Sequence, residues 1–366
     1  MDTGLYARAH QKVIELLPLL KGEEFQIEKI WDILGLQKRK EHTPYKIAIG
    51  TVLYNLSQVN KNPIFKQIGK RYKVIQEIKP VRWWEAKDNE LFDLSFPYGH
   101  EDDSHFGFED LIEISPGDLI VISGVSNTGK SALALNILGE NIDKNPCVLM
   151  GNEYTALGGE LNSKFKGRML RMKWVSWMND NNEAKFDLLP IRADFEDHIV
   201  PDKINIIDWI NLTDQFYKIG LILEDIKAGI GKGLAVVVLQ KEEEKELGRG
   251  KGFTRDLADV YFSIDPFGER QSRLSIQKVK APTGRVYNRH WAFKVVDRGA
   301  NLLDIREVTK CLKCWGKGYT KSGRCENCSG KGFLEKNYKE KPIITKGSFE
   351  EERELMQKIA EEQAEF

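Results

Sequence analysis

DLIVISGVSNTGKSALALNIL, at residues 118–138, is the stretch that decides the fold of this chain. Its first part, residues 118–123, predicts a buried strand, and residues 132–138 continue as a helix. Residues 124–131 between them read G-x-x-x-x-G-K-S, a phosphate-binding loop pattern that is meaningful in this strand–loop–helix context. Its glycines let backbone N–H groups turn toward an anion at a helix N-terminus. We therefore predict a nucleoside triphosphate site, with ATP as the cofactor.

The last two residues of this loop have specific expected roles. Lys130 neutralises the β- and γ-phosphates, and the Ser131 hydroxyl holds Mg²⁺. The residues expected to surround the nucleotide are Gly124, Ser126, Asn127, Thr128, Gly129, Lys130 and Ser131.

Three further apolar runs end in polar residues. The run 147–150 leads to Glu153, the run 204–207 ends at Asp208, and the run 234–239 ends at Gln240. Runs of this kind alternate with helical patterns over residues 109–305, which predicts an α/β fold with a mainly parallel twisted sheet. Because carboxyl ends of parallel strands share one edge, these side chains should meet the phosphate loop. We expect Asp208 to bind Mg²⁺, Glu153 to polarise the attacking water, and Gln240 to contact the γ-phosphate.

This order of motifs resembles the RecA-like core of the DnaB-type hexameric helicases. DLADV at 256–260 and SIQKVKAPTG at 275–284 resemble two further family stretches, and the similarity spans about residues 106–305. The resemblance implies that Lys278 and Lys280 act on a neighbouring subunit's ATP. A lysine stands at 280 where the family has arginine, and it lacks arginine's planar fork. Arg285 or Arg289 could substitute for it.

The same resemblance implies a homo-oligomer, a ring of six, that acts on DNA. Loops such as residues 241–253 face the central channel in that family. The resemblance therefore makes Arg249 and Lys251 candidate contacts to the backbone of single-stranded DNA.

The first 82 residues are strongly basic. The segment from Gln37 to Arg82 contains eleven Lys and Arg but two Glu, which gives it a net charge of +9. Residues 5–20, 26–36 and 45–57 predict helices, and residues 64–78 predict a hairpin. Three helices and a basic hairpin resemble a winged helix, which implies DNA binding, with a protein-docking domain as the alternative. The expected contacts to the DNA backbone are Lys46, Lys66, Lys70, Arg71 and Lys73.

Cys311, Cys314, Cys325 and Cys328 form two copies of C-x-x-C-x-G-x-G. Four thiolates at this spacing predict a closed, structural Zn²⁺ site, with a redox dithiol as the alternative. The doubled motif resembles half of the Cys-rich domain of the DnaJ chaperones.

Composition limits the remaining possibilities. The 366 residues contain 55 basic and 55 acidic side chains, and no apolar run approaches the ~20 residues of a membrane span. The N-terminus lacks a signal-peptide pattern, so we expect a cytoplasmic protein without a membrane partner. We predict a winged-helix-like domain at 1–82, a linker at 83–108, the ATPase domain at 109–305, a zinc finger at 306–335 and an acidic helical tail at 336–366.

Three functions fit these motifs. The first is an ATP-hydrolysing DNA helicase or translocase in replication or recombination. The second is a RecA/RadA-like recombination or repair ATPase that does not unwind DNA. The third is an ATP-switched regulator or loader without motor activity.

Overall fold

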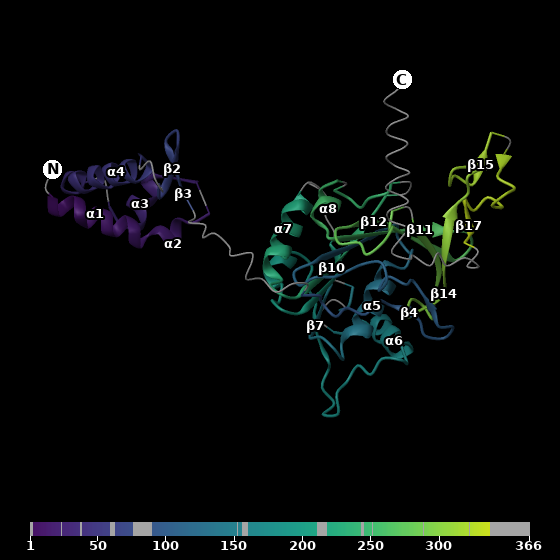
Figure 1. Cartoon of the computed structure of the whole chain (residues 1–366). Helices are drawn as coiled ribbons and strands as arrows, with labels where there is room; N and C mark the ends of the chain where they lie inside the picture. Colours follow the sequence, from purple (N-terminus) through teal and green to yellow (C-terminus); the bar gives the residue numbers. More distant parts are fainter. Residues whose placement is uncertain are drawn as a thin grey trace, which may run out of the picture. The chain divides into compact units, whose positions relative to one another are not determined.

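The computed structural model describes residues 3–22, 24–36, 39–58, 63–75, 90–151, 153–155, 160–210, 218–242, 245–250, 252–287, 289–321 and 323–336. The chain divides into two compact units, residues 1–87 and 88–366 (Figure 1). Among the described residues, no helix is both long and apolar enough to cross a membrane.

The first unit combines helices with a small antiparallel sheet. The helices are α1 (Thr3–Glu15), α2 (Leu17–Leu20), α3 (Ile27–Ile33) and α4 (Thr43–Gln58), with a 3-10 turn at Lys40–His42. Strands β1 (Glu24–Gln26), β2 (Phe65–Ile68) and β3 (Arg71–Val74) pair in the order β1-β3-β2. The predicted helices and hairpin are confirmed, whereas β1, with three residues, is too short to give a sequence pattern.

A ten-stranded sheet forms the centre of the second unit, in the order β17-β14-β13-β12-β11-β6-β10-β9-β7-β8. The six strands from β11 to β8 are mutually parallel, and the others continue antiparallel. The parallel strands are β6 (Leu119–Gly124), β7 (Cys147–Met150), β8 (Phe186–Leu189), β9 (Ile204–Ile210), β10 (Leu234–Gln240) and β11 (Val260–Phe267). The antiparallel strands are β12 (Gln271–Val279), β13 (His290–Val296), β14 (Asn301–Lys310) and β17 (Phe333–Glu335). The predicted α/β fold class is confirmed.

Helices cover both faces of this sheet. They are α5 (Lys130–Asn141), α6 (Ser163–Arg171), α7 (Ile219–Gly229) and α8 (Gly252–Leu257), with a 3-10 turn at Phe195–His198. Along β6, Ile120 and Ile122 join the apolar cluster that contains α5 residues, whereas Leu119 and Val121 join the cluster that contains α7 residues. Because both faces are buried, these strands are continuously apolar in sequence.

The segment 83–108, predicted as a linker that packs on another part of the chain, is described from residue 90 onward, and this described part packs on the core of the second unit. Phe96, Phe106 and Phe108 are buried in the α5-side cluster, and Phe108 stacks on Phe262 with ring centroids 4.9 Å apart. Strands β4 (Tyr98–Gly99) and β5 (Ser104–His105) form a short antiparallel pair in the same segment. Burying these aromatic rings favours packing of the segment against the sheet, although it lacks any periodic pattern.

Residues 305 and 306, between which the sequence predicts a domain boundary, both lie inside β14. Strands β14 and β17 pair at the edge of the ten-stranded sheet, so the cysteine segment 311–332 is an excursion between two strands of that sheet. It contains the small strands β15 (Tyr319–Thr320) and β16 (Gly323–Arg324). Residues 337–366, the predicted acidic tail, lie outside the described residues.

Candidate functional site

The phosphate loop joins β6 to α5 at the carboxyl edge of the parallel strands. Gly129 has a φ of +90°, and a Cβ atom there would lie 2.6 Å from Cγ2 of Val295. The position therefore requires glycine for both its backbone conformation and its close approach to β13. The Thr128 hydroxyl donates to the Val125 carbonyl at 2.8 Å, which holds the turn closed on itself.

Lys130, the first residue of α5, is buried beside this turn. Its ammonium group donates to the Val125 carbonyl at 2.7 Å. Burial lowers the pKa of Lys130 to about 8, while the carboxylates of Asp208 and Glu153 oppose the shift. A phosphate group at this position would supply the negative charge that a buried ammonium group needs.

Ser131 and Asp208 meet although 77 positions separate them in sequence. The Ser131 hydroxyl donates to Asp208 Oδ1 at 2.9 Å, and the Tyr154 hydroxyl donates to Asp208 Oδ2 at 2.8 Å. The contact follows from the strand order, since β10 alone separates β9 from β6. Burial raises the pKa of Asp208, and the two hydrogen bonds act against that shift. A hydroxyl beside a carboxylate is a ligand set that suits Mg²⁺.

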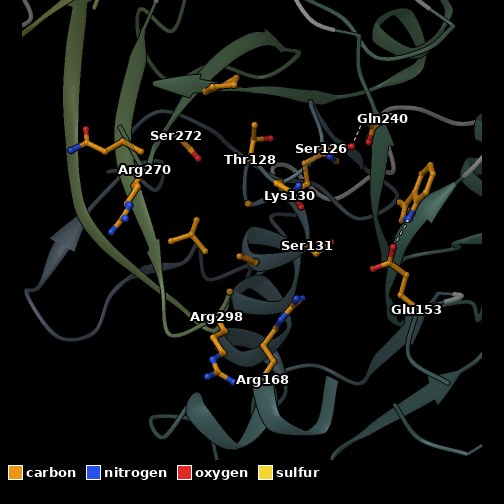
Figure 2. A pocket seen from close by; sticks show the side chains of 18 of the residues that line it. Ser126, Thr128, Lys130, Ser131, Glu153, Arg168, Gln240, Arg270, Ser272 and Arg298 are labelled. Carbon is orange, nitrogen blue, oxygen red and sulfur yellow. Dashed lines mark hydrogen bonds between the residues drawn. The ribbon is translucent and has the colours of Figure 1, made fainter. Parts of the chain in front are cut away.

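Glu153 and Gln240 lie on the same edge. The Gln240 side chain donates to the Ser126 hydroxyl at 2.9 Å, and Gln240 stands in register with Gly124 of β6. Glu153 follows β7 and accepts a hydrogen bond from the Trp209 indole at 3.3 Å. The structure therefore brings Glu153, Asp208 and Gln240 together with the phosphate loop. Figure 2 shows six of the predicted residues around one cavity: Ser126, Thr128, Lys130, Ser131, Glu153 and Gln240.

Except for Gly124 and Asp208, the predicted nucleotide residues line a cavity of about 720 Å³, within the range of small-molecule sites. Besides Lys130, three arginines line it: Arg168 from α6, Arg270 from the β11–β12 turn and Arg298 from the β13–β14 turn (Figure 2). Of the described residues lining the cavity, Glu153 alone carries a carboxylate. Such a cavity favours a ligand with several negative charges.

Sequence reasoning missed the arginines because they belong to no motif and come from three separate elements. Arg168 is the most constrained of them. Its Nε is buried, and no hydrogen-bond partner for it occurs within the described part of the chain. A Cβ on Gly299 would lie 3.2 Å from this Nε, so the β13–β14 turn holds the guanidinium closely. A buried, unsatisfied donor beside the phosphate loop points to an anionic partner.

Lys278 and Lys280 lie near the amino ends of the parallel strands, whereas the phosphate loop of their own chain lies at the carboxyl ends. Val279 pairs with Val260, the first residue of β11, at the amino edge of the parallel strands. Lys278 donates to the carbonyls of Arg255 and Asp256 at 3.0 and 2.7 Å, and Lys280 pairs with Asp259 at 3.2 Å.

Arg285 and Arg289, the two candidates to take the role of Lys280, differ in their contacts and exposure. Nε and Nη2 of Arg289 donate to the two oxygens of the Glu307 carboxylate at 2.9 and 2.8 Å, so this guanidinium is already paired within its own chain. Arg285 is exposed in the loop between β12 and β13.

The predicted DNA contacts occupy different settings. Lys66, Lys70, Arg71 and Lys73 are exposed on the β2–β3 hairpin, and Arg71 lies 3.5 Å from Glu24. Lys46 is half-buried, with its ammonium group 4.6 Å from the centroid of the Trp31 ring. In the second unit, the Arg249 amide donates to the Gln240 carbonyl at 2.9 Å, which places Arg249 next to a residue that lines the cavity. Lys251 lies outside the described residues.

The four cysteines of the C-terminal excursion converge, with all their sulfur atoms within 4.8 Å of one another. The Cys311–Cys325 and Cys314–Cys328 sulfurs are 3.9 and 3.6 Å apart. Zn–S bonds of ~2.3 Å in a tetrahedron place sulfur atoms about 3.8 Å apart. Backbone amides of Gly318 and Gly332 donate to the sulfurs at 3.3 and 3.1 Å, as a thiolate site requires. The cluster could hold zinc.

Comparisons with known proteins add little to this picture. No protein-family model and no curated protein matches the chain. Among solved structures, it is similar to the KaiC-like protein PH0186 of Pyrococcus horikoshii OT3, with a TM-score of 0.41 and 14% identity over 58% of this chain and 99% of that chain. It is also similar to the RadB recombinase, with a TM-score of 0.37 and 13% identity over 52% and 92% of the two chains.

Proposed function

We propose that this protein is a Mg²⁺-dependent ATPase with a RecA-like core. The hydrogen bond between Ser131 and Asp208 carries this proposal, because it joins the end of the phosphate loop to an acid two strands away. The pair lies at the edge of a cavity lined by four cationic side chains. Mg²⁺–ATP has the charge and the metal that such a site would bind.

The roles of the residues follow from their positions. Lys130 would neutralise the β- and γ-phosphates, and Ser131 and Asp208 would hold Mg²⁺, which neutralises charge that develops on the phosphate oxygens. Glu153 would orient and polarise the attacking water. Gln240 would contact the γ-phosphate and transmit its loss toward residues 241–253, because its side chain already bonds to Ser126 of the phosphate loop.

We expect Arg168→Ala to raise the KM for ATP about 10- to 100-fold, because a hydrogen bond from a charged donor contributes roughly 1.5–3 kcal/mol. Initial hydrolysis rates over a range of ATP concentrations would measure this. Lys166→Ala, which removes an exposed lysine of the same helix, is the control and should leave KM unchanged. An unchanged KM in Arg168→Ala would exclude a contact between Arg168 and the nucleotide.

We further propose that the ATPase is a DNA helicase or translocase that works as a homo-oligomer, a hexameric ring. The exposed basic hairpin β2–β3 supports a winged-helix contact to DNA, and Arg249 lies next to the nucleotide site. Lys278 and Lys280 lie at the edge of the sheet away from their own phosphate loop, so their action would be on a neighbouring subunit.

The test is the ATP hydrolysis rate with and without single-stranded DNA, together with the molecular mass in solution with nucleotide. Severalfold stimulation and a nucleotide-dependent oligomer are expected. Absence of stimulation would favour the ATP-switched regulator. A stimulated oligomer that fails to unwind a forked duplex would instead favour the RecA/RadA-like recombination or repair ATPase.

We also propose that the four cysteines hold one structural Zn²⁺. The site would be closed, since four thiolates leave no position for a substrate. Metal analysis of the purified protein should find about one zinc per chain, and a content below about half an equivalent would favour the redox dithiol.

A further inference from the structure

The cysteine segment contains two similar turns, residues 311–318 and 325–332, and the first of them exposes a large aromatic side chain. Trp315 is 76% exposed, and its φ of +53° lies in the left-handed region, which L side chains adopt only at a cost. The equivalent position of the second turn is Ser329, with a φ of +49°. The two turns thus share the left-handed backbone conformation at this position, whereas their sequences differ at three positions: Leu312 and Glu326, Lys313 and Asn327, and Trp315 and Ser329. The turn itself does not need a tryptophan, because serine occupies the same conformation.

Other exposed side chains surround Trp315 in sequence and belong to the same excursion. Leu312 is 73% exposed and Tyr319 is 65% exposed. Apart from the cysteines, residues 311–332 contain six charged side chains. Five are cations, Lys313, Lys317, Lys321, Arg324 and Lys331, and one is an acid, Glu326. A zinc ion with four thiolates would add a charge of −2, so the excursion stays positive.

The excursion is firmly attached to the ATPase sheet. The Cys311 amide donates to the Gly332 carbonyl at 2.8 Å, which closes its base. Phe333 of β17 packs on Phe267 with ring centroids 6.1 Å apart, and Phe267 precedes the turn that contributes Arg270 to the cavity. A ligand on the excursion would therefore be held at a fixed distance from the nucleotide site.

We propose that this surface, defined by Trp315, Tyr319 and Lys317, binds single-stranded nucleic acid. Unpaired bases stack on exposed aromatic rings whatever their sequence, and nearby lysines neutralise the phosphates between them. The combination of aromatic rings with cations favours this partner over an apolar peptide, which would gain nothing from the lysines. The surface goes beyond the DNA contacts of the proposed ATPase, which lie on the β2–β3 hairpin and near Arg249.

The experiment measures binding of a fluorescein-labelled oligothymidylate to the full chain without nucleotide, by anisotropy at several salt concentrations. Trp315→Ala should weaken binding about tenfold, which corresponds to loss of one base–aromatic stack. Trp315→Phe keeps a ring and should stay within about threefold of the parent protein. Lys317→Ala should lower the salt slope by about one, as expected for one phosphate contact.

Leu312→Ala is the matched control, because Leu312 is equally exposed in the same turn but has no ring for stacking. It should leave oligothymidylate binding unchanged. Zinc content, measured for each variant, shows whether the excursion has folded. Hydrolysis of ATP without DNA should equal that of the parent protein in every variant, so a failure of the ATPase proposal would be visible separately.

Two results would overturn the proposal. One is parental affinity in a zinc-loaded Trp315→Ala variant. The other is an equal loss in Leu312→Ala, which would indicate a general apolar docking surface. A labelled peptide of residues 348–366, with seven Glu, serves as a competitor. If the peptide and not the oligonucleotide requires Trp315, the surface binds the acidic segment of this chain instead.

Discussion

Glu153→Gln is expected to lower the rate of ATP hydrolysis by about 10²–10⁴-fold, the usual contribution of a positioned general base. Glutamine keeps the size of the side chain and its ability to accept from the Trp209 indole, but it cannot take a proton from water. ATP binding should therefore persist while turnover stops. Single-turnover hydrolysis, together with equilibrium binding of a fluorescent ATP analogue, separates the two effects.

The control for this variant is Glu160→Gln, which removes an exposed carboxylate seven positions further along the chain. Its hydrolysis rate should match that of the parent protein. If Glu153→Gln hydrolyses ATP within a factor of ten of the parent, another group activates the water.

Lys130→Ala is expected to remove both binding and hydrolysis of ATP, with at least about a 100-fold loss of kcat/KM. The lysine is buried between the Val125 carbonyl and the cavity, so no solvent-exposed cation can replace it. In this variant Arg168, Arg270 and Arg298 would be the remaining cations among the described residues that line the cavity (Figure 2).

Steady-state hydrolysis and nucleotide binding measure this variant, and thermal unfolding without nucleotide shows whether its fold is intact. Lys166→Ala again serves as a surface control and should retain parental activity. Turnover at the parental rate by a folded Lys130→Ala protein would contradict the assignment of residues 124–131 to the nucleotide.

The sequence predicted that Ser131 and Asp208, and Gln240 and the phosphate loop, lie close together, because local patterns identify the loop and the strand ends. A strand, a glycine-rich turn and a helix occur consecutively at residues 118–138, so the turn can be identified without knowing what surrounds it. Asp208 was predicted from its place at the end of an apolar run. Its partner Tyr154 was not, since nothing in the sequence around Tyr154 indicates a hydrogen bond to a residue 54 positions away.

The packing of two segments, residues 90–108 and β14, depends on contacts that no sequence pattern shows. Residues 90–108 lack periodicity, and a linker was the natural interpretation, yet Phe106 and Phe108 are buried in the main core. The strand β14 crosses the expected boundary at 305/306, because β17, contributed from beyond the cysteines, completes the same sheet. In both segments long-range burial, rather than local propensity, decides the structure.

The sequence by itself determined the phosphate loop, the acids at the strand ends and the four-cysteine pattern, since each depends on residue type and short spacing. Only the tertiary structure decided that Arg168, Arg270 and Arg298 share one cavity, and that Lys278 and Lys280 lie at the other edge of the sheet. The physical reason is strand order: the sequence of strands along the chain does not say which edges and turns become neighbours once the sheet has formed.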